Sequence, residues 1–385
     1  MRVLYDHQVF TAQKFGGISR YFFELMKHSN GLFEYDVSGV YSENVYMKQL
    51  GIYKEFPIKT GFKGKYRVVD FFNKLNSIKI IKQGDYDIIH PTYYGTYMLG
   101  KICSRQTDRK KKQDTLPWEE NIAIHKNEVL THKKQGYILF TGQRNGYKNF
   151  GKFAEAIAPL LIRYDLRLIC TGQAFTKEEE AFLFKHKIGD RVTSKFVSDS
   201  ELRDIYAKAI LFAFPSLYEG FGIPILEAFS SGCPVVLSNA SCFPEIAEDA
   251  AVYFDPNSIE DMREAIGRVL QDSSLQSTLA KKGHDRLASF SWEKTTRNTA
   301  QVYSSLLSLP DQNGKCLVVT VYDMIHELFP EAFSCKDKTA SSKYLMMKNA
   351  DKIIAISKNT KVDILKLYPE IDAEKIEVIH LGTSF

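Results

Sequence analysis

The chain has 385 residues, of which 44% are hydrophobic, and its formal net charge is +5 at pH 7. This length predicts two domains, and the small net charge argues against a nucleic-acid-binding protein. The six cysteines include no C-x-x-C pair, the first ten residues are too polar for a secretory signal, and no apolar run is long enough to span a membrane. We therefore expect a cytoplasmic protein whose contact with any membrane is peripheral.

Residues 1–100 have the pattern of half an open α/β sheet. Strands are predicted over 3–9, 35–41 and 86–90, and a clear helix over 66–82. Gly16 and Gly17 stand ahead of a helix and permit close approach of the backbone to a ligand. His90 and Tyr93 follow a strand and are candidates for a ligand crevice, although a purely structural histidine is an equally good interpretation.

Residues 101–136 are polar and rich in charge, and we interpret them as a linker with a solvated basic run. Residues 137–290 then alternate between strand and helix patterns, which predicts a parallel, doubly wound sheet. Its strands are expected over 137–141, 166–171, 192–196, 210–214, 234–237 and 251–254. A helix over 292–307, within 291–308, ends this part of the chain.

Residues 309–385 contain another half of a sheet. Its expected strands lie over 316–322, 352–356 and 376–381, with helices over 341–349 and 359–367. A parallel sheet needs cover on both faces, and three strands alone cannot easily provide a core. We therefore predict one discontinuous domain made of 1–100 plus 309–385.

One stretch, 214–236, carries most of the chemistry. A buried strand is followed by a glycine-containing loop, a short helix that begins near Pro224, and the next strand. Free backbone N–H groups at such a helix start favour an anion. Glu219 and Glu227 cannot bind phosphate, but their carboxylates accept hydrogen bonds from sugar hydroxyls. Together these features indicate a sugar-nucleotide site.

The stretch resembles the retaining glycosyltransferases of family four, whose signature is two glutamates eight residues apart around EGFG-P-EA. The resemblance implies the GT-B fold: an α/β protein with two Rossmann-like, doubly wound domains that face a cleft. It implies that 137–290 binds the nucleotide-sugar donor and that helix 291–308 crosses back to the first domain. In the family, a segment like 315–385 precedes the donor domain, so here that segment is displaced to the C-terminus.

The resemblance also implies site residues. Glu219, Asp323 and His326 are the catalytic candidates, although Tyr322 stands where relatives often carry the histidine of a histidine–aspartate pair. The donor-binding candidates are Arg144, Lys148, Phe196, Val197, Gly220, Phe221, Gly222, Ile223, Glu227, Gly16 and Gly17. Among these, Arg144 and Lys148 would hold the diphosphate by charge-assisted contacts.

The implied reaction moves a hexose from a nucleotide-sugar to a saccharide or lipid-linked saccharide, with no cofactor and no metal. FGGISRYF and GYKNF resemble mannosyltransferases of bacterial surface polysaccharide assembly, which favours GDP-mannose over a UDP-sugar. A sugar-nucleotide epimerase and a non-catalytic nucleotide-binding protein stay open as alternatives. Basic residues such as Lys79, Lys82 and Arg109 raise the hypothesis of contact with the inner face of the membrane.

Overall fold

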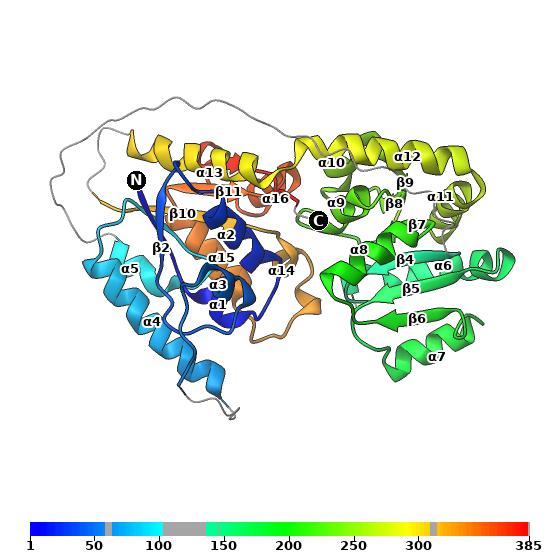
Figure 1. Cartoon of the computed structure of the whole chain (residues 1–385), viewed down its shortest axis with the longest axis horizontal. Coiled ribbons are helices and arrows are strands. Elements are labelled where there is room, and N and C mark those ends of the chain that lie inside the picture. The colour runs from blue at the N-terminus through cyan, green and yellow to red at the C-terminus, as the bar shows by residue number, and fades with distance from the viewer. Residues whose placement is uncertain (58–63, 103–135, 145, 309–313, 384–385) are drawn as a thin grey trace.

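The computed structural model of the 385-residue chain describes residues 1–57, 64–102, 136–144, 146–308 and 314–383. These residues form two parallel sheets of six strands each, and helices cover both sheets. The two units lie side by side along the long axis of the molecule (Figure 1). This arrangement confirms the predicted class, an α/β protein with two Rossmann-like domains.

The first sheet joins strands from the two ends of the chain. In spatial order it contains β12 (Ile376–Val378), β11 (Lys352–Ala355), β10 (Cys316–Val321), β3 (Ile88–His90), β1 (Arg2–Tyr5) and β2 (Glu34–Val37). The two halves meet where β10 pairs with β3, with Cys316 opposite Ile88. Its helices are α1 (Gln8–Ala12), α2 (Gly17–Lys27), α3 (Val45–Leu50), α4 (Lys65–Gln83), α5 (Leu99–Ile102), α14 (Ile325–Leu328), α15 (Thr339–Asn349) and α16 (Lys358–Leu367).

The second sheet is built from one continuous part of the chain. In spatial order it contains β6 (Val192–Lys195), β5 (Arg167–Thr171), β4 (Tyr137–Thr141), β7 (Leu211–Phe214), β8 (Val235–Ser238) and β9 (Ala251–Phe254). Its helices are α6 (Phe150–Arg163), α7 (Lys177–Lys185), α8 (Asp199–Lys208), α9 (Ile223–Ser230), α10 (Phe243–Ala247), α11 (Ile259–Gln271) and α12 (Ser273–Arg286). The strand order reverses between β4 and β7, so their carboxyl ends border the crevice typical of ligand sites in such sheets.

Helix α13 (Trp292–Leu307) leads from the second unit onto the first, as Figure 1 shows. Its bounds agree with the helix predicted from the sequence. The Tyr303 hydroxyl lies 3.2 Å from that of Tyr5 in β1, and Thr295 donates to the carbonyl of His380 at 2.8 Å. Helix α13 is therefore packed against strands or loops from both ends of the chain.

The first predicted strand, over 3–9, is wrong in its second half. Strand β1 ends at Tyr5, and α1 follows almost at once. The reason is the buried carboxylate of Asp6, which accepts hydrogen bonds from the backbone N–H and the hydroxyl of Thr92 at 2.8 and 2.6 Å. These bonds tie the end of β1 to the loop after β3 and turn the chain.

The predicted linker, 101–136, lies outside the described residues except at its two ends, and Arg109 lies there with it. The sequence did not predict the short helices α1, α3, α5, α10 and α14, nor α12. Within the described ranges, no helix combines the length and the apolar character that crossing a bilayer requires.

Candidate active site

The candidate site forms where the loops after β4 and β7 meet. The two strands are neighbours, so their following loops lie side by side. The N–H of Leu217 donates to the carbonyl of Tyr147 at 2.7 Å. Nζ of Lys148 lies 2.5 Å from Oε1 of Glu219, and each side chain is only 14% exposed. Two predicted site residues, 71 positions apart, are thus an ion pair at the point where the strand order reverses.

Helix α9 begins beside this pair. Gly222, just before the helix, has φ +87°, a left-handed conformation that glycine adopts without strain. Ile223 and Pro224 are the first helical residues, and the backbone N–H groups of such a first turn have no helical acceptor. A methyl group at Gly17 would lie 3.9 Å from Cδ1 of Ile223. The start of α2, which Gly16 precedes, therefore faces the start of α9 from the first domain.

Gly220 lies directly against the first domain. A methyl group there would overlap the carbonyl oxygen of Tyr322 and would lie 3.0 Å from Cβ of Asp323. Ser357, at the start of α16, donates to the carbonyl of Gly220 at 2.8 Å. The glycine is therefore required for the close approach of the first domain, and its role in donor binding stays a prediction.

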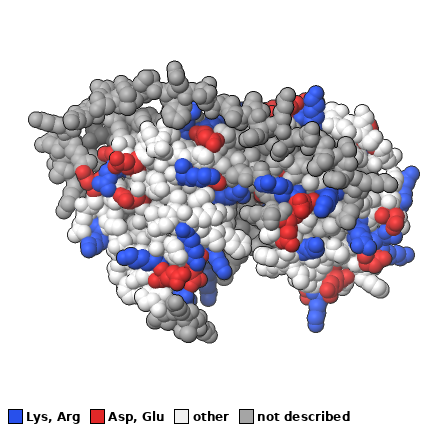
Figure 2. All heavy atoms as spheres, viewed as in Figure 1, with Lys and Arg blue, Asp and Glu red and all other residues white. Residues whose placement is uncertain are grey.

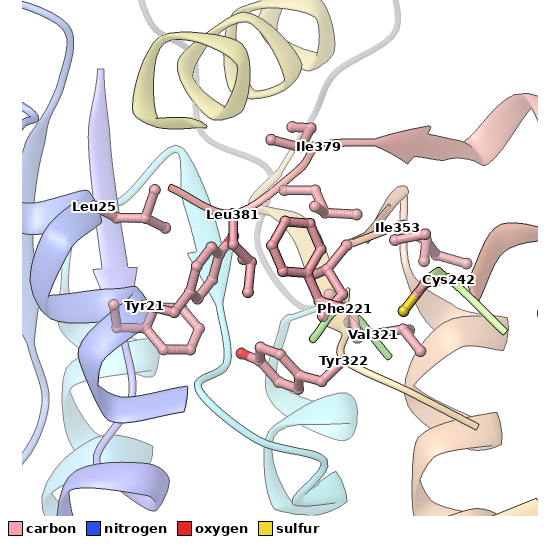
Figure 3. Packing of buried hydrophobic residues seen from close by; sticks show 14 of the residues in the cluster. Tyr21, Leu25, Phe221, Cys242, Val321, Tyr322, Ile353, Ile379 and Leu381 are labelled. Carbon is pink, nitrogen blue, oxygen red and sulfur yellow. The ribbon is translucent and has the colours of Figure 1, made fainter. Parts of the chain in front are cut away.

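Phe221 lies in the apolar core between the domains. It is 3% exposed, and its ring centroid is 5.9 Å from those of Phe290 and His380. Figure 3 shows the ring among residues of the first domain, with Tyr322 and Leu381 nearby. In this structure the Phe221 side chain packs in the interface between the two domains and is not exposed to a donor.

Asp323 comes from the first domain and lies against the same loop. Its Oδ1 accepts the N–H of Ile325 at 3.1 Å and is 3.8 Å from Nζ of Lys343. Lys343 is 1% exposed and also donates to Glu327 at 2.9 Å and to the Asp323 carbonyl at 2.7 Å. Burial, with the charges of Glu219 and Asp323, raises the pKa of Tyr147 to about 12. The charges of two of the catalytic candidates therefore act on the same phenol.

His326 lies in α14, just beyond Asp323. Its ring stacks on Phe333, with centroids 3.9 Å apart, and its Nε2 is 3.8 Å from Oδ2 of Asp337. Burial and the nearby Lys343 ammonium lower the pKa of His326, against the opposing pull of Asp323, so a neutral imidazole is favoured. Its Nδ1 is buried and has no hydrogen-bond partner among the described residues.

Arg144 is held by oxygen atoms of its own domain. Its Nε lies 2.8 Å from Oε1 of Glu179, and its Nη2 donates to the carbonyls of Gln173 and Ala174 at 2.8 and 2.9 Å. The guanidinium also covers the ring of Phe175 at 4.5 Å. With 6% of its side chain exposed, Arg144 organises the loop after β5 in this structure, and Lys148 is the basic residue paired with Glu219.

The remaining donor candidates lie farther along the same edge of the sheet. Glu227, in the second turn of α9, accepts a hydrogen bond from the buried Tyr206 hydroxyl at 3.2 Å. Phe196 and Val197 follow β6, and the Phe196 ring is 78% exposed. A bare aromatic ring at a strand end offers a stacking surface.

The crevice interpretation of His90 is wrong. The imidazole is fully buried, with Nδ1 2.6 Å from the Tyr303 hydroxyl and Nε2 2.8 Å from that of Thr320. Burial lowers the pKa of His90 to about 3. His90 therefore joins β3, β10 and α13 as a neutral core residue. Tyr93 is half-buried, with its ring centroid 4.8 Å from that of Tyr94.

Sequence reasoning missed three residues that organise the site. Tyr147 precedes a predicted site lysine and could have been found from that position. Lys343 and Glu245 carry no such signal, because their partners lie far away in the sequence. Glu245, in α10, accepts from the N–H groups of Lys358 and Asn359 at 2.7 and 3.2 Å, which are the first two residues of α16.

The two facing Rossmann-like domains have the GT-B arrangement. A solved structure of sucrose-phosphate synthase from Thermosynechococcus elongatus has a TM-score of 0.54 to this chain at 16% identity, covering 80% of this chain and 99% of that one. At this identity the likeness shows the fold alone.

The family model matches mainly the second domain. Residues 121–286 match the family model described as Glycosyl transferases group 1. The chain is 34% identical over 181 residues to the O-antigen chain mannosyltransferase B of Escherichia coli, which covers 45% of this chain and 46% of that protein. It is 29% identical over 151 residues to the O-antigen chain mannosyltransferase RfbU of Salmonella typhimurium, 39% of this chain and 43% of that protein. The matches thus span somewhat under half the length of these relatives.

Proposed function

We propose that this protein is a retaining glycosyltransferase that moves mannose from GDP-mannose to a saccharide or lipid-linked saccharide acceptor. The observation that carries the proposal is the Lys148–Glu219 ion pair beside the start of α9, at the reversal of strand order. The match of 121–286 to the glycosyltransferase model supports the class of reaction. The mannosyltransferase names of the relatives support the sugar.

In the proposed reaction, the bond between the anomeric carbon and the diphosphate oxygen breaks while a bond to the acceptor hydroxyl oxygen forms on the same face. The acceptor proton passes to the departing phosphate oxygen. Lys148 and the N–H groups at the start of α9 stabilise the charge that grows on the diphosphate. Glu219 contacts the donor sugar, Glu227 binds the ribose, and Asp323 and His326 lie on the acceptor side.

The ion pair adds a consequence for donor binding. In the structure, the ammonium of Lys148, which the diphosphate would use, donates a hydrogen bond to the Glu219 carboxylate. The diphosphate must therefore compete with Glu219 for Lys148. Removing the carboxylate charge frees the ammonium, so nucleotide binding and sugar transfer are expected to respond in opposite directions.

The test is calorimetric titration of GDP and UDP into the wild type, Lys148→Ala and Glu219→Gln, with Lys152→Ala as the control from the exposed face of α6. We expect GDP to bind more tightly than UDP. Lys148→Ala should weaken the binding of GDP by about 10- to 100-fold, which corresponds to the loss of one hydrogen bond to a charged group. Glu219→Gln should bind GDP at least as tightly as the wild type, and Lys152→Ala should match the wild type.

Turnover separates the remaining possibilities. Radiolabelled GDP-mannose is incubated with a membrane extract of acceptors, and the product is separated from free sugar. Transfer of mannose is supported if the wild type places label in the acceptor fraction and Glu219→Gln does not. Free altered sugar without acceptor would identify an epimerase, and tight nucleotide binding without turnover would identify a non-catalytic binding protein. Tighter binding of UDP would reassign the donor.

A further inference from the structure

The backbone of Glu219 is held by a serine from the loop after the neighbouring strand, β8. The Ser241 hydroxyl accepts the N–H of Glu219 at 3.1 Å and donates to the carbonyl of the same residue at 2.5 Å. The Cys242 thiol lies 3.2 Å from that carbonyl as a second donor. Burial and the Glu219 carboxylate raise the pKa of Cys242, so the thiol keeps its proton. Both backbone polar groups of Glu219 are thus bound by the loop after β8.

Ser241 adopts a backbone conformation that serine seldom has. Its φ is +56°, in the left-handed region that favours glycine. A glycine at this position would avoid the strain but would have no hydroxyl to offer. Strained residues persist where the surrounding structure holds them, and they are frequent at functional sites. The strained backbone of Ser241 directs its hydroxyl at Glu219.

The loop that carries Ser241 is fixed on both sides. Before it, the N–H of Asn239 donates to the carbonyl of Phe254 in β9 at 2.7 Å. After it, Cys242 is fully buried, and Figure 3 shows its side chain in the apolar cluster between the domains. This loop can therefore hold the backbone of Glu219 in a defined position.

The residues on either side of Glu219 are bound by the other domain. The Tyr218 hydroxyl donates at 2.8 Å to an aspartate of α16, and Ser357 donates to the carbonyl of Gly220 at 2.8 Å. Between these two contacts, Ser241 binds the backbone of Glu219 from its own domain. A movement of the first domain that pulls on the two neighbours is therefore opposed at Glu219 itself.

The pairing of Glu219 with Lys148 makes this placement matter. Figure 2 shows basic and acidic side chains interspersed at the surface of one face of the molecule, where water weakens their interactions. The side chains of Lys148 and Glu219 are only 14% exposed each, so their attraction is less screened and depends on the distance between ammonium and carboxylate. A shift of the Glu219 backbone would change this distance.

We propose that Ser241 is a positioning residue, whose hydroxyl holds the Glu219 carboxylate against Lys148 and at the donor sugar. The inference rests on the proposed function, in which Glu219 contacts that sugar. Without the hydroxyl, Glu219 stays in its loop but its backbone can shift, and a misplacement of about 1 Å can slow a reaction about 100-fold. The loss is expected in kcat, because Lys148, which binds the diphosphate, is unchanged.

The first experiment needs no donor. The coupling between Lys148 and Glu219 is measured by chemical denaturation of Lys148→Ala, Glu219→Gln and the double variant, once in the wild type and once in Ser241→Ala. We expect the coupling free energy to fall by about half or more without the Ser241 hydroxyl. The control, Ser238→Ala, removes a buried hydroxyl that donates to the Phe214 carbonyl at 3.4 Å, and it should leave the coupling unchanged. Equal coupling with and without the Ser241 hydroxyl overturns the proposal.

The second experiment measures transfer from GDP-mannose by Ser241→Ala and Ser241→Gly. Both variants lack the hydroxyl, but glycine adopts φ +56° without strain, so Ser241→Gly should be the more stable of the two. We expect kcat to fall about 10- to 100-fold in both, with a KM for GDP-mannose no higher than that of the wild type. A kcat that recovers in Ser241→Gly, or a raised KM with unchanged kcat, would mean a structural role only and would overturn the proposal.

The proposed function and the role of Ser241 fail separately in these experiments. If the wild type transfers no label, mannose transfer fails, while the coupling between Lys148 and Glu219 still decides whether Ser241 holds Glu219. If the wild type transfers label but neither the coupling nor kcat responds to loss of the Ser241 hydroxyl, the positioning role alone is refuted.

Discussion

Replacing Glu245 by alanine should weaken the junction between the two domains far more than its place in a five-residue helix suggests. Oε1 of Glu245 lies 2.6 Å from Nε2 of His380, and the carboxylate accepts the first two N–H groups of α16 at 2.7 and 3.2 Å. The next N–H, that of Thr360, is bound by Ser357 at 3.1 Å. A carboxylate of the second domain thus completes the cap of a helix in the first domain.

The magnitude follows from these contacts. Loss of a helix cap costs about 0.5–2 kcal/mol, and loss of a hydrogen bond to a charged group costs about 1.5–3 kcal/mol. Because water reaches part of the vacated space, we expect the free energy of unfolding to fall by about 2–4 kcal/mol in total. At about 2–4 °C per kcal/mol, the unfolding midpoint should fall by roughly 4–16 °C. The assay is thermal unfolding of Glu245→Ala at pH 7, followed by circular dichroism.

The control is Asp249→Ala, a few residues along the chain. Asp249 pairs with Lys282 at 2.6 Å, but its side chain is 79% exposed, so its loss should move the midpoint by no more than about 2 °C. Equal shifts for the two variants would refute the claim that Glu245 joins the domains. The His380→Ala variant should lose part of the same free energy of unfolding. The double variant Glu245→Ala/His380→Ala should lose less than the sum of the two single losses.

The difference in stability between the wild type and Glu245→Ala should depend on pH in a definite direction. Burial opposes ionisation of Glu245, but hydrogen bonds from His380 and the α16 backbone outweigh it and hold the pKa of Glu245 below its ordinary value of 4.5. Since the folded pKa is lowered, the carboxylate contributes its stability above pH 4.5 and loses it as the pH falls through the folded pKa. The difference in unfolding free energy between wild type and Glu245→Ala should therefore narrow as the pH falls below 4.5. A difference that widens as the pH falls below 4.5 would contradict the assignment.

Three further predictions concern other parts of the structure. Gly220→Ala should lower both transfer activity and the unfolding midpoint, because its methyl group overlaps the backbone of Tyr322 and forces the domains apart; unchanged activity would show that the loop has room. The His90 imidazole, with its pKa lowered to about 3, should show no titration by NMR from pH 7.5 to 5, and its protonation on unfolding should destabilise the fold as the pH falls below 6.5; a titration near pH 6.5 would refute its burial. Lys343→Met should destabilise by roughly 3–5 kcal/mol in chemical denaturation, because Glu327 is left buried and unpaired, whereas Lys343→Met/Glu327→Leu should recover part of that loss.

The elements that sequence reasoning located correctly are those with a local cause. Strand β4 and helix α13 have the predicted bounds, because an apolar run and an amphipathic period are properties of neighbouring residues. Glu219 and Lys148 could be matched to a motif, and the order of strands then brings their loops together.

Residues whose role depends on a distant partner could not be placed in this way. Nothing near Arg144 in the sequence indicates that its guanidinium pairs with Glu179, 35 positions away. Phe221 has the appearance of a loop residue, yet the other domain buries it. His90 ends a strand, as a ligand-binding residue would, and the difference from a core residue lies in Tyr303, 213 positions away.

The C-terminal segment explains why these long-range partners matter together. Ser357 binds the carbonyl of Gly220 at 2.8 Å, Asp363 accepts the Tyr218 hydroxyl at 2.8 Å, and His380 pairs with Glu245. Tyr218 and Gly220 are the neighbours of Glu219 in its loop, and Glu245 lies in α10. The same segment supplies β10, β11 and β12 of the first sheet. The position of Glu219 relative to Lys148 therefore depends on the folding of the last strands of the chain, so a substitution that unpairs β10 from β3 should disturb the site although no site residue changes.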